Sequence, residues 1–252
     1  ITDATAVSGF MADYAPDYVV NCAAYTAVDK AEQEKEACFR LNAAAPSFLA
    51  EACHIHGARM IHISTDYVFD GTASVPYKED DPVNPKGIYG ASKLEGEMGC
   101  MKFPGTLIIR TSWLYSSFGH NFVLTILNKG QENGQLNVVY DQVGTPTWAA
   151  DLAGAILHIV KRSANQPDAW KPGIYHYSGE GVCSWYDFAL AIFRFRGINC
   201  RVNPVETKDF ITLAKRPAYS VLNKSKIKNN FQLTIPHWME SLEKCLTKLN
   251  KE

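Results

Sequence analysis

Tyr89 and Lys93 stand four residues apart in the stretch IYGASKLEGE, and this pair could transfer a proton. Positions i and i+4 lie on one face of a helix, so the Lys93 ammonium is expected close to the Tyr89 phenol. A free tyrosine has a pKa of about 10, and a neighbouring cation lowers that pKa by favouring the phenolate. The pair therefore predicts a tyrosine that exchanges a proton with a carbonyl or an alcohol near neutral pH.

A buried strand upstream ends in polar side chains. Residues 59–64 (RMIHIS) are followed directly by Thr65 and Asp66. In an open α/β sheet, side chains at the carboxyl edge face the ligand, so the Thr65 hydroxyl is expected to bond the same substrate oxygen as Tyr89. An isolated Tyr-x-x-x-Lys pair is common on solvated helices, and this neighbouring strand end is what favours a site. The chemistry predicted is hydride transfer between a nicotinamide and a carbon that bears oxygen.

The elements that position these residues alternate between strands and helices. Apolar runs predict strands buried on both faces at 18–22, 59–64 and 106–112, with helices at 36–56 and 88–101. Asp29 and Glu32 have the spacing of a capping box at a helix start. This alternation predicts an α/β fold, specifically a Rossmann-like doubly wound parallel sheet. Further elements are predicted beyond the joints rich in Pro, Gly and Asn that follow residue 112: helices near 121–129, 148–162, 184–196 and 236–250, and strands near 137–140 and 174–178.

Two regions are predicted from this pattern. Residues 1–140 form most of a nicotinamide-dinucleotide-binding domain, and residues 141–252 form most of a smaller, interleaved substrate lobe, with 148–178 returning to the main sheet. A dinucleotide-binding domain normally starts with a strand, a Gly-rich turn and a helix. This chain starts with a pattern typical of a later helix, so the first βαβ unit is expected to be absent from the sequence.

Composition limits the classes of partner. Lys and Arg (25) nearly balance Asp and Glu (26) without a basic block, which argues against nucleic acid. Seven scattered cysteines lack C-x-x-C spacing and indicate reduced thiols in a cytoplasmic protein, with neither a disulfide framework nor a metal site. Hydrophobic residues make up 46% of the chain, but no apolar stretch reaches the ~18 residues of a membrane span.

Seven blocks in order carry a resemblance to a known family: NCAAYTAVDKAE, STDYVFDG, EDDPVNPKGIYGASKLEGE, LIIRTSWLY, NFV, DQVGTPTWAADLA and RPAYSVL. They resemble the dTDP-4-dehydrorhamnose reductases of the extended short-chain dehydrogenase/reductase superfamily. The resemblance implies reduction of the C4 ketone of a dTDP-linked 6-deoxyhexose, giving dTDP-L-rhamnose, with NADPH or NADH as hydride donor. Its implied catalytic residues are Thr65, Tyr89 as general acid, and Lys93, which would also hold the nicotinamide ribose.

The same resemblance implies the binding residues. Those expected along the cofactor are Ala23, Ala24, Tyr25, Asn42, Ser64, Lys93, Thr111 and Ser112. Those expected along the sugar are Thr26, Val28, Asp66, Tyr67 and Trp113, and those expected at the nucleotide diphosphate are Asn121 and Arg216. The other tryptophans, among them Trp170 and Trp185, are expected to be packing residues.

Several properties stay open at the sequence level. The residues that would choose between NADH and NADPH are not in the sequence, and relatives differ in forming homodimers and in being helped by Mg²⁺. A nucleotide-sugar 4-epimerase uses the same Tyr and Lys pair, and a non-catalytic cofactor-binding regulatory subunit keeps the same fold. A dehydratase is disfavoured because Tyr67 stands where those relatives carry a glutamate base.

Overall fold

A four-stranded parallel sheet organises the chain, and the computed structural model describes residues 1–249. Its strands are β1 (Tyr18–Asn21), β2 (Arg59–Thr65), β3 (Thr106–Thr111) and β8 (Gly173–His176), in the order β1-β2-β3-β8. The β2–β3 register pairs Thr65 with Thr111, so both strands end at the same level. The predicted parallel α/β sheet is thereby confirmed.

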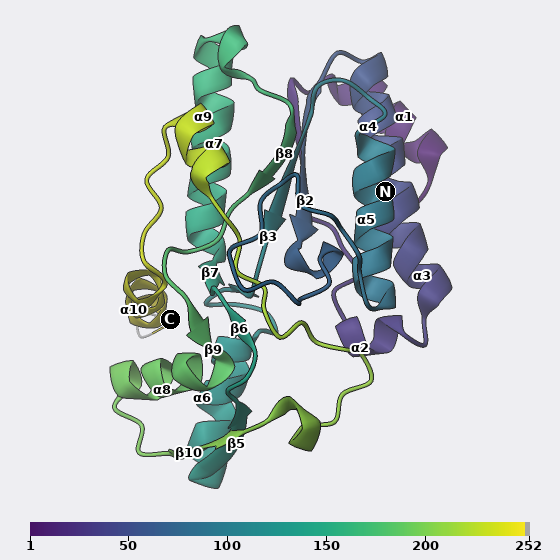
Figure 1. Cartoon of the computed structure of the whole chain (residues 1–252). Coiled ribbons are helices and arrows are strands. Elements are labelled where there is room, and N and C mark those ends of the chain that lie inside the picture. Colours follow the sequence, from purple (N-terminus) through teal and green to yellow (C-terminus); the bar gives the residue numbers. More distant parts are fainter. Residues whose placement is uncertain (250–252) are drawn as a thin grey trace.

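Helices cover both faces of this sheet (Figure 1). On one face lie α1 (Ala4–Tyr14), α4 (Ala45–Ile55) and α5 (Ile88–Cys100), and on the other lie α7 (Ala149–Asn165) and α9 (Ser225–Phe231). An apolar layer fills each interface: Met60 and Ile108 point toward α1 and α4, while Leu107 and Ile109 pack against α7 and α9. Alternate side chains of a strand point to opposite faces, which is why the apolar residues of β2 and β3 are consecutive, at Met60–Ile61 and at Leu107–Ile109.

A smaller lobe lies below the carboxyl end of the sheet in Figure 1. Its apolar core joins three helices, α6 (Phe122–Asn133), α8 (Trp185–Arg196) and α10 (Trp238–Lys248). The parallel pair β5 (Gln135–Val139) and β10 (Arg201–Val205) borders them. Two short pairs connect the lobe to the main sheet: β4 (Leu114–Tyr115) with β7 (Thr147–Trp148), and β6 (Val143–Gly144) with β9 (Cys183–Ser184).

Short helical segments complete the chain. α2 (Val28–Ala31) and α3 (Lys35–Phe39) follow β1, and a π-helical turn, η1 (Arg40–Ala44), leads α3 directly into α4. The 3-10 turns are η2 (Asp66–Val68), η3 (Pro167–Ala169) and η4 (Thr207–Asp209). None of the helices within residues 1–249 is long and apolar enough to cross a bilayer.

Two local predictions are wrong. β1 is not buried on both faces, because it lies at a sheet edge and its Val20 is 40% exposed. Asp29 and Glu32 form no capping box: no side chain caps α2, Asp29 pairs with Arg216, and Glu32 Oε1 accepts from Ile88 N. These carboxylates connect α2 to distant segments because tertiary partners compete with a local cap.

The helix predicted to residue 250 ends at Lys248, and residue 250 lies outside the described residues.

Candidate active site

The carboxyl end of β2 places three predicted site residues in a tight turn. Thr65 Oγ1 accepts a hydrogen bond from Tyr67 N at 3.3 Å and donates one to Asp66 Oδ1 at 3.0 Å. This side-chain cap starts η2 immediately after the strand and turns Tyr67 out of the sheet. Thr65 and Asp66 are buried, and Tyr67 is partly buried. The turn thus satisfies Thr65 Oγ1 and Asp66 Oδ1 locally, whereas Asp66 Oδ2 is buried without a hydrogen-bond partner among residues 1–249.

Tyr89 reaches this turn from the first turn of α5. Its ring meets the Tyr67 ring edge-on with centroids 5.4 Å apart, and its hydroxyl lies close enough to Thr65 for Thr65 to influence its pKa. Burial raises the pKa of Tyr89 above its usual range, and the Thr65 hydrogen bond offsets only part of that rise. The expected lowering of this pKa by Lys93 is therefore wrong in this structure, because desolvation of the phenolate dominates.

Lys93 lies one turn further along α5 and is buried, with 2% of its surface exposed. Its ammonium donates to Ile63 O at 2.6 Å and lies 3.3 Å from His62 Nε2, so its nearest partners are on β2. Burial lowers the pKa of Lys93 to about 8, although Glu97 acts in the opposite direction. His62 is buried between Lys93 and Asn21, whose Nδ2 lies 3.1 Å from His62 Nδ1.

The segment predicted to lie along the cofactor follows β1. Asn42, in the π-helical turn, accepts from Tyr25 N at 2.8 Å and donates to Tyr25 O at 3.1 Å. The same amide donates to Ser92 Oγ at 3.0 Å, which connects this segment to α5 between Tyr89 and Lys93. Ala23 is held by a bond from its N–H to Asn21 Oδ1. Asn42 therefore fixes the backbone of the Ala23–Ala24–Tyr25 segment against the helix that carries Tyr89.

The Ser64 side chain, at a position predicted to lie along the cofactor, makes its hydrogen bond within the protein. It is buried and donates to Glu97 Oε1 at 2.5 Å. Glu97 also forms a bidentate ion pair with Arg110, with Nη2–Oε2 at 2.7 Å and Nε–Oε1 at 2.9 Å. The Ser64 side chain thus belongs to a polar layer between β2, β3 and α5, beneath the site.

At the end of β3, Thr111 and Ser112 close the strand beside Thr65. Thr111 Oγ1 is buried and has no hydrogen-bond partner among residues 1–249, whereas Ser112 Oγ donates to Thr145 O at 2.8 Å. An unpaired buried hydroxyl is costly and is typical of a position that a ligand completes. Together with Thr65, Tyr89 and Lys93, it fits the nicotinamide half of a dinucleotide at the carboxyl edge.

The residues predicted to contact the sugar nucleotide do not all lie together. Arg216 and Tyr67 meet: Arg216 Nη1 donates to Tyr67 Oη at 3.0 Å, and its Nη2 pairs with Asp29 at 2.7 Å, beside Val28 in α2. Asn121 instead caps α6, accepting from Leu124 N and donating to Ser116 O. Thr26 is exposed in the loop before α2.

Asp66 is a deeply buried carboxylate, with 3% of its surface exposed. Burial raises its pKa to about 7, and the Thr65 hydrogen bond opposes this rise. The side chain is therefore close to half-protonated at neutral pH, so it can donate as well as accept a hydrogen bond.

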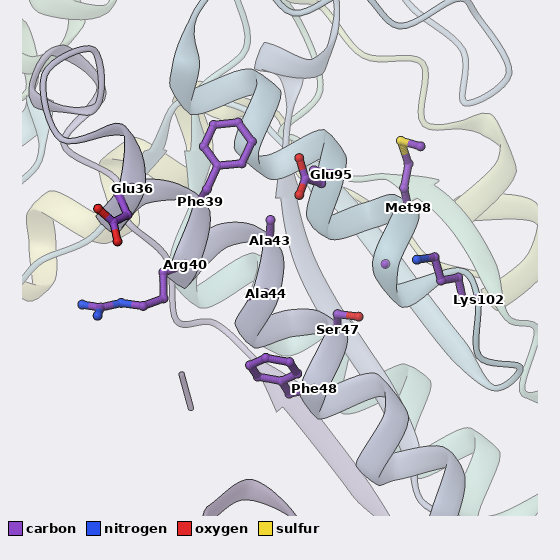
Figure 2. Close-up of a pocket in the computed structure, with 11 residues that line it drawn as sticks. Glu36, Phe39, Arg40, Ala43, Ala44, Ser47, Phe48, Glu95, Met98 and Lys102 are labelled. Carbon is purple, nitrogen blue, oxygen red and sulfur yellow. The ribbon is translucent and has the colours of Figure 1, made fainter. Parts of the chain in front are cut away.

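Two cavities differ in their relation to these residues. The smaller, about 320 Å³, is lined by Tyr67 and Arg216, with Lys86 and Lys215 nearby, and so adjoins the site. The larger, about 610 Å³, lies between the α3–η1–α4 stretch and the outer face of α5 (Figure 2). None of the predicted site residues lines it, and its charged groups are Glu36, Arg40, Glu95 and Lys102. Because size alone indicates no chemistry, we place the site at the strand ends.

The sequence could have indicated some of the partners that it missed. Glu97 follows Lys93 by four residues, the same spacing that identified Tyr89, and Arg110 directly precedes Thr111. The sequence predicts Asp29 to be a cap and not a partner of Arg216, because no local pattern signals a contact across so long a separation. Within residues 1–249, no group of three or more potential metal-ligating side chains is present.

Comparison with known proteins gives one consistent family. The family model described as "RmlD substrate binding domain" matches residues 1–251. A dTDP-4-dehydrorhamnose reductase of Sinorhizobium fredii is 42% identical over 245 residues, covering 95% of this chain and 83% of that protein. The crystal structure of a dTDP-4-dehydrorhamnose reductase from Clostridium acetobutylicum superposes with a TM-score of 0.93 at 43% identity, covering 99% of this chain and 86% of the other. That of Bacillus anthracis, in complex with NADP, gives 0.93 at 38% identity, covering 98% and 86%.

Proposed function

The chain belongs to the RmlD substrate binding domain family, and from this premise we propose that it reduces the C4 ketone of dTDP-4-dehydro-L-rhamnose to dTDP-L-rhamnose, using NADPH or NADH. Membership confirms the resemblance drawn from the sequence. The observation that carries the proposal is that Tyr89 packs on the turn that Thr65 caps at the carboxyl end of β2, with its ring 5.4 Å from that of Tyr67 and with Lys93 one turn further along α5.

The residues divide the work of reduction between them. A bound reduced nicotinamide supplies the hydride. Tyr89 donates its phenolic proton to the C4 oxygen, and its raised pKa keeps the phenol protonated, which is the form that reduction requires. Thr65 orients both the phenol and the substrate oxygen. Lys93 binds the nicotinamide ribose. The Thr111 hydroxyl, which has no hydrogen-bond partner among residues 1–249, would form its hydrogen bond to the same cofactor.

Loss of the Tyr89 hydroxyl tests this assignment. The measurement is oxidation of NADPH and NADH in the presence of the dTDP-4-keto-6-deoxy sugar and the 3,5-epimerase that makes its L-configured form. Tyr89→Phe should lower kcat by about 10²–10⁴-fold, because general acid catalysis contributes this much. Cofactor binding, followed by fluorescence titration, should stay within about twofold of the unsubstituted protein because the ribose contact is kept.

Tyr18→Phe is the matched control. Tyr18 lies at the amino end of β1, where its hydroxyl accepts from Arg59, far from the carboxyl edge. This variant should keep full turnover. Turnover of Tyr89→Phe equal to that of Tyr18→Phe would exclude Tyr89 as the proton donor. Cofactor-dependent interconversion of C4 epimers without net oxidation would instead indicate the epimerase, and binding without turnover would indicate the regulatory subunit.

Three properties stay predictions of this proposal. The relative from Bacillus anthracis was solved with NADP, so we expect NADPH to be used, and the same assay compares it with NADH. A Mg²⁺ requirement predicts lower activity after treatment with EDTA, restored by Mg²⁺. A homodimer predicts twice the mass of the chain in light scattering.

A further inference from the structure

Trp113 adopts a backbone conformation that bulky side chains rarely take. It follows β3 directly and has φ of 46°, in the left-handed region. A large aromatic residue at positive φ is an outlier, and such a conformation persists only where its surroundings hold it in place. The indole is partly buried, between the end of the main sheet and the smaller lobe. This raises the question of which contacts impose the conformation.

The first contact is a parallel stack on Trp185. The two ring centroids are 3.5 Å apart and their planes differ by 7°. Trp185 is itself fixed, because it is the first residue of α8 and Ser184 and Asp187 form a capping box there. Its ring also packs on Phe122, with centroids 4.5 Å apart. The stack therefore places Trp113 against a rigid part of the smaller lobe.

The second contact is with Gly144 in β6. A Cβ at this position would lie 2.5 Å from Trp113 Cε2 and 2.5 Å from Ser220 Oγ, so only glycine leaves room for the indole. The backbone is fixed as well, since Thr147 N donates to Trp113 O at 3.1 Å. Gly144 in the DQVGTPT block and Trp185 in the CSWYDF stretch thus both contact the Trp113 side chain.

We propose that Trp185 is a positioning residue for substrate binding: together with Gly144 it holds Trp113 as a rigid wall of the sugar pocket. The inference rests on the proposed function, because Trp113 is a predicted sugar contact. A flat, immobile indole loses little conformational entropy when it binds a pyranose ring, and this favours the substrate ground state and transition state alike. Trp185, expected from sequence to be a packing residue, therefore acts on substrate affinity through Trp113.

The test compares Trp185→Ala and Trp185→Phe with Trp170→Ala. Trp170 is a matched control, partly buried and packed on Tyr18 away from the site. Trp185→Ala should raise the KM for the sugar nucleotide about three- to tenfold with kcat unchanged, the fold-change expected for losing one aromatic pair. Trp185→Phe should restore most of the affinity, and Trp170→Ala should leave KM as it is.

A structural readout accompanies the kinetics. Two indoles stacked at this distance give an exciton couplet in circular dichroism, which should disappear in Trp185→Ala and Trp185→Phe and persist in Trp170→Ala. An unchanged KM in Trp185→Ala, or an equal rise in Trp170→Ala, would overturn the inference while leaving the proposed function intact. If the folded, unsubstituted protein showed no turnover, both the proposed function and this inference would be overturned.

Discussion

Breaking the ion pair between Glu97 and Arg110 should destabilise the fold more than most single substitutions. Both side chains are 2% exposed, and the carboxylate takes three hydrogen bonds from the guanidinium and one from Ser64. The Arg110 guanidinium also lies over the Phe69 ring, with its Cζ 5.1 Å from the ring centroid. Neither charge has access to water, so neither can be left without the other.

The magnitude follows from this burial. Removing one partner of a buried pair costs about 3–5 kcal/mol, because the remaining charge is desolvated and unpaired. Glu97→Leu and Arg110→Leu should each lower the free energy of unfolding by about that amount. The double variant removes both charges and should lose less than the sum of the two single losses, by about 2 kcal/mol or more.

Urea unfolding at constant pH measures this cycle, with the midpoint and the slope fitted separately. Glu206→Leu is the control, because its ion pair with Lys208 has a similar length, 2.7 Å, but is exposed. Exposed pairs contribute little, so this variant should unfold like the native protein. Single losses as small as that of the control, or losses that simply add in the double variant, would refute the reasoning.

Two further predictions concern the same region. Burial raises the pKa of Asp66 from 3.8 to about 7, so its contribution to stability is fully present below about pH 4 and is lost as the pH rises through 7. The free energy of unfolding of the native protein should therefore fall relative to Asp66→Asn between pH 4 and 7, and a constant difference in urea titrations would contradict this. Gly96→Ala should cost about 1–3 kcal/mol, because the new Cβ would collide with Asn42 O, whereas Gly154→Ala, with open space around it, should be neutral or stabilising; equal unfolding midpoints for the two variants would contradict the close approach.

Sequence patterns located the elements and brought the candidate site residues together because those signals are local. Apolar runs predicted β2 and β3 nearly to the residue, and the four-residue spacing predicted that Tyr89 and Lys93 share α5. The position of Thr65 at a strand end was sufficient to bring it to Tyr89. These inferences use only the periodicity of one element or the common edge of a parallel sheet.

The environment of each group could not be read in the same way. The pKa of Tyr89 depends on how deeply the phenol is buried, and the sequence indicates the lysine but not the depth. Likewise, Lys93 donates to the backbone carbonyl of Ile63, and a backbone acceptor cannot be recognised from the type of residue that carries it. Asp29 and Arg216 meet across most of the chain, so the apparent capping box was the stronger local pattern and gave the wrong partner.

The polar layer beneath the site explains how the strand ends keep their alignment. Ser64 pairs with Arg110 in the β2–β3 register, both side chains reach Glu97, and the next pair in that register is Thr65 with Thr111. A one-residue slip of β2 would turn Ser64 to the opposite face and leave the ion pair without its third partner. Apolar strand residues alone would tolerate such a slip better, because both faces of β2 and β3 are covered by apolar layers. The buried charges therefore specify the register that sets Thr65 beside Tyr89, so the proposed reaction depends on residues that need not touch the substrate.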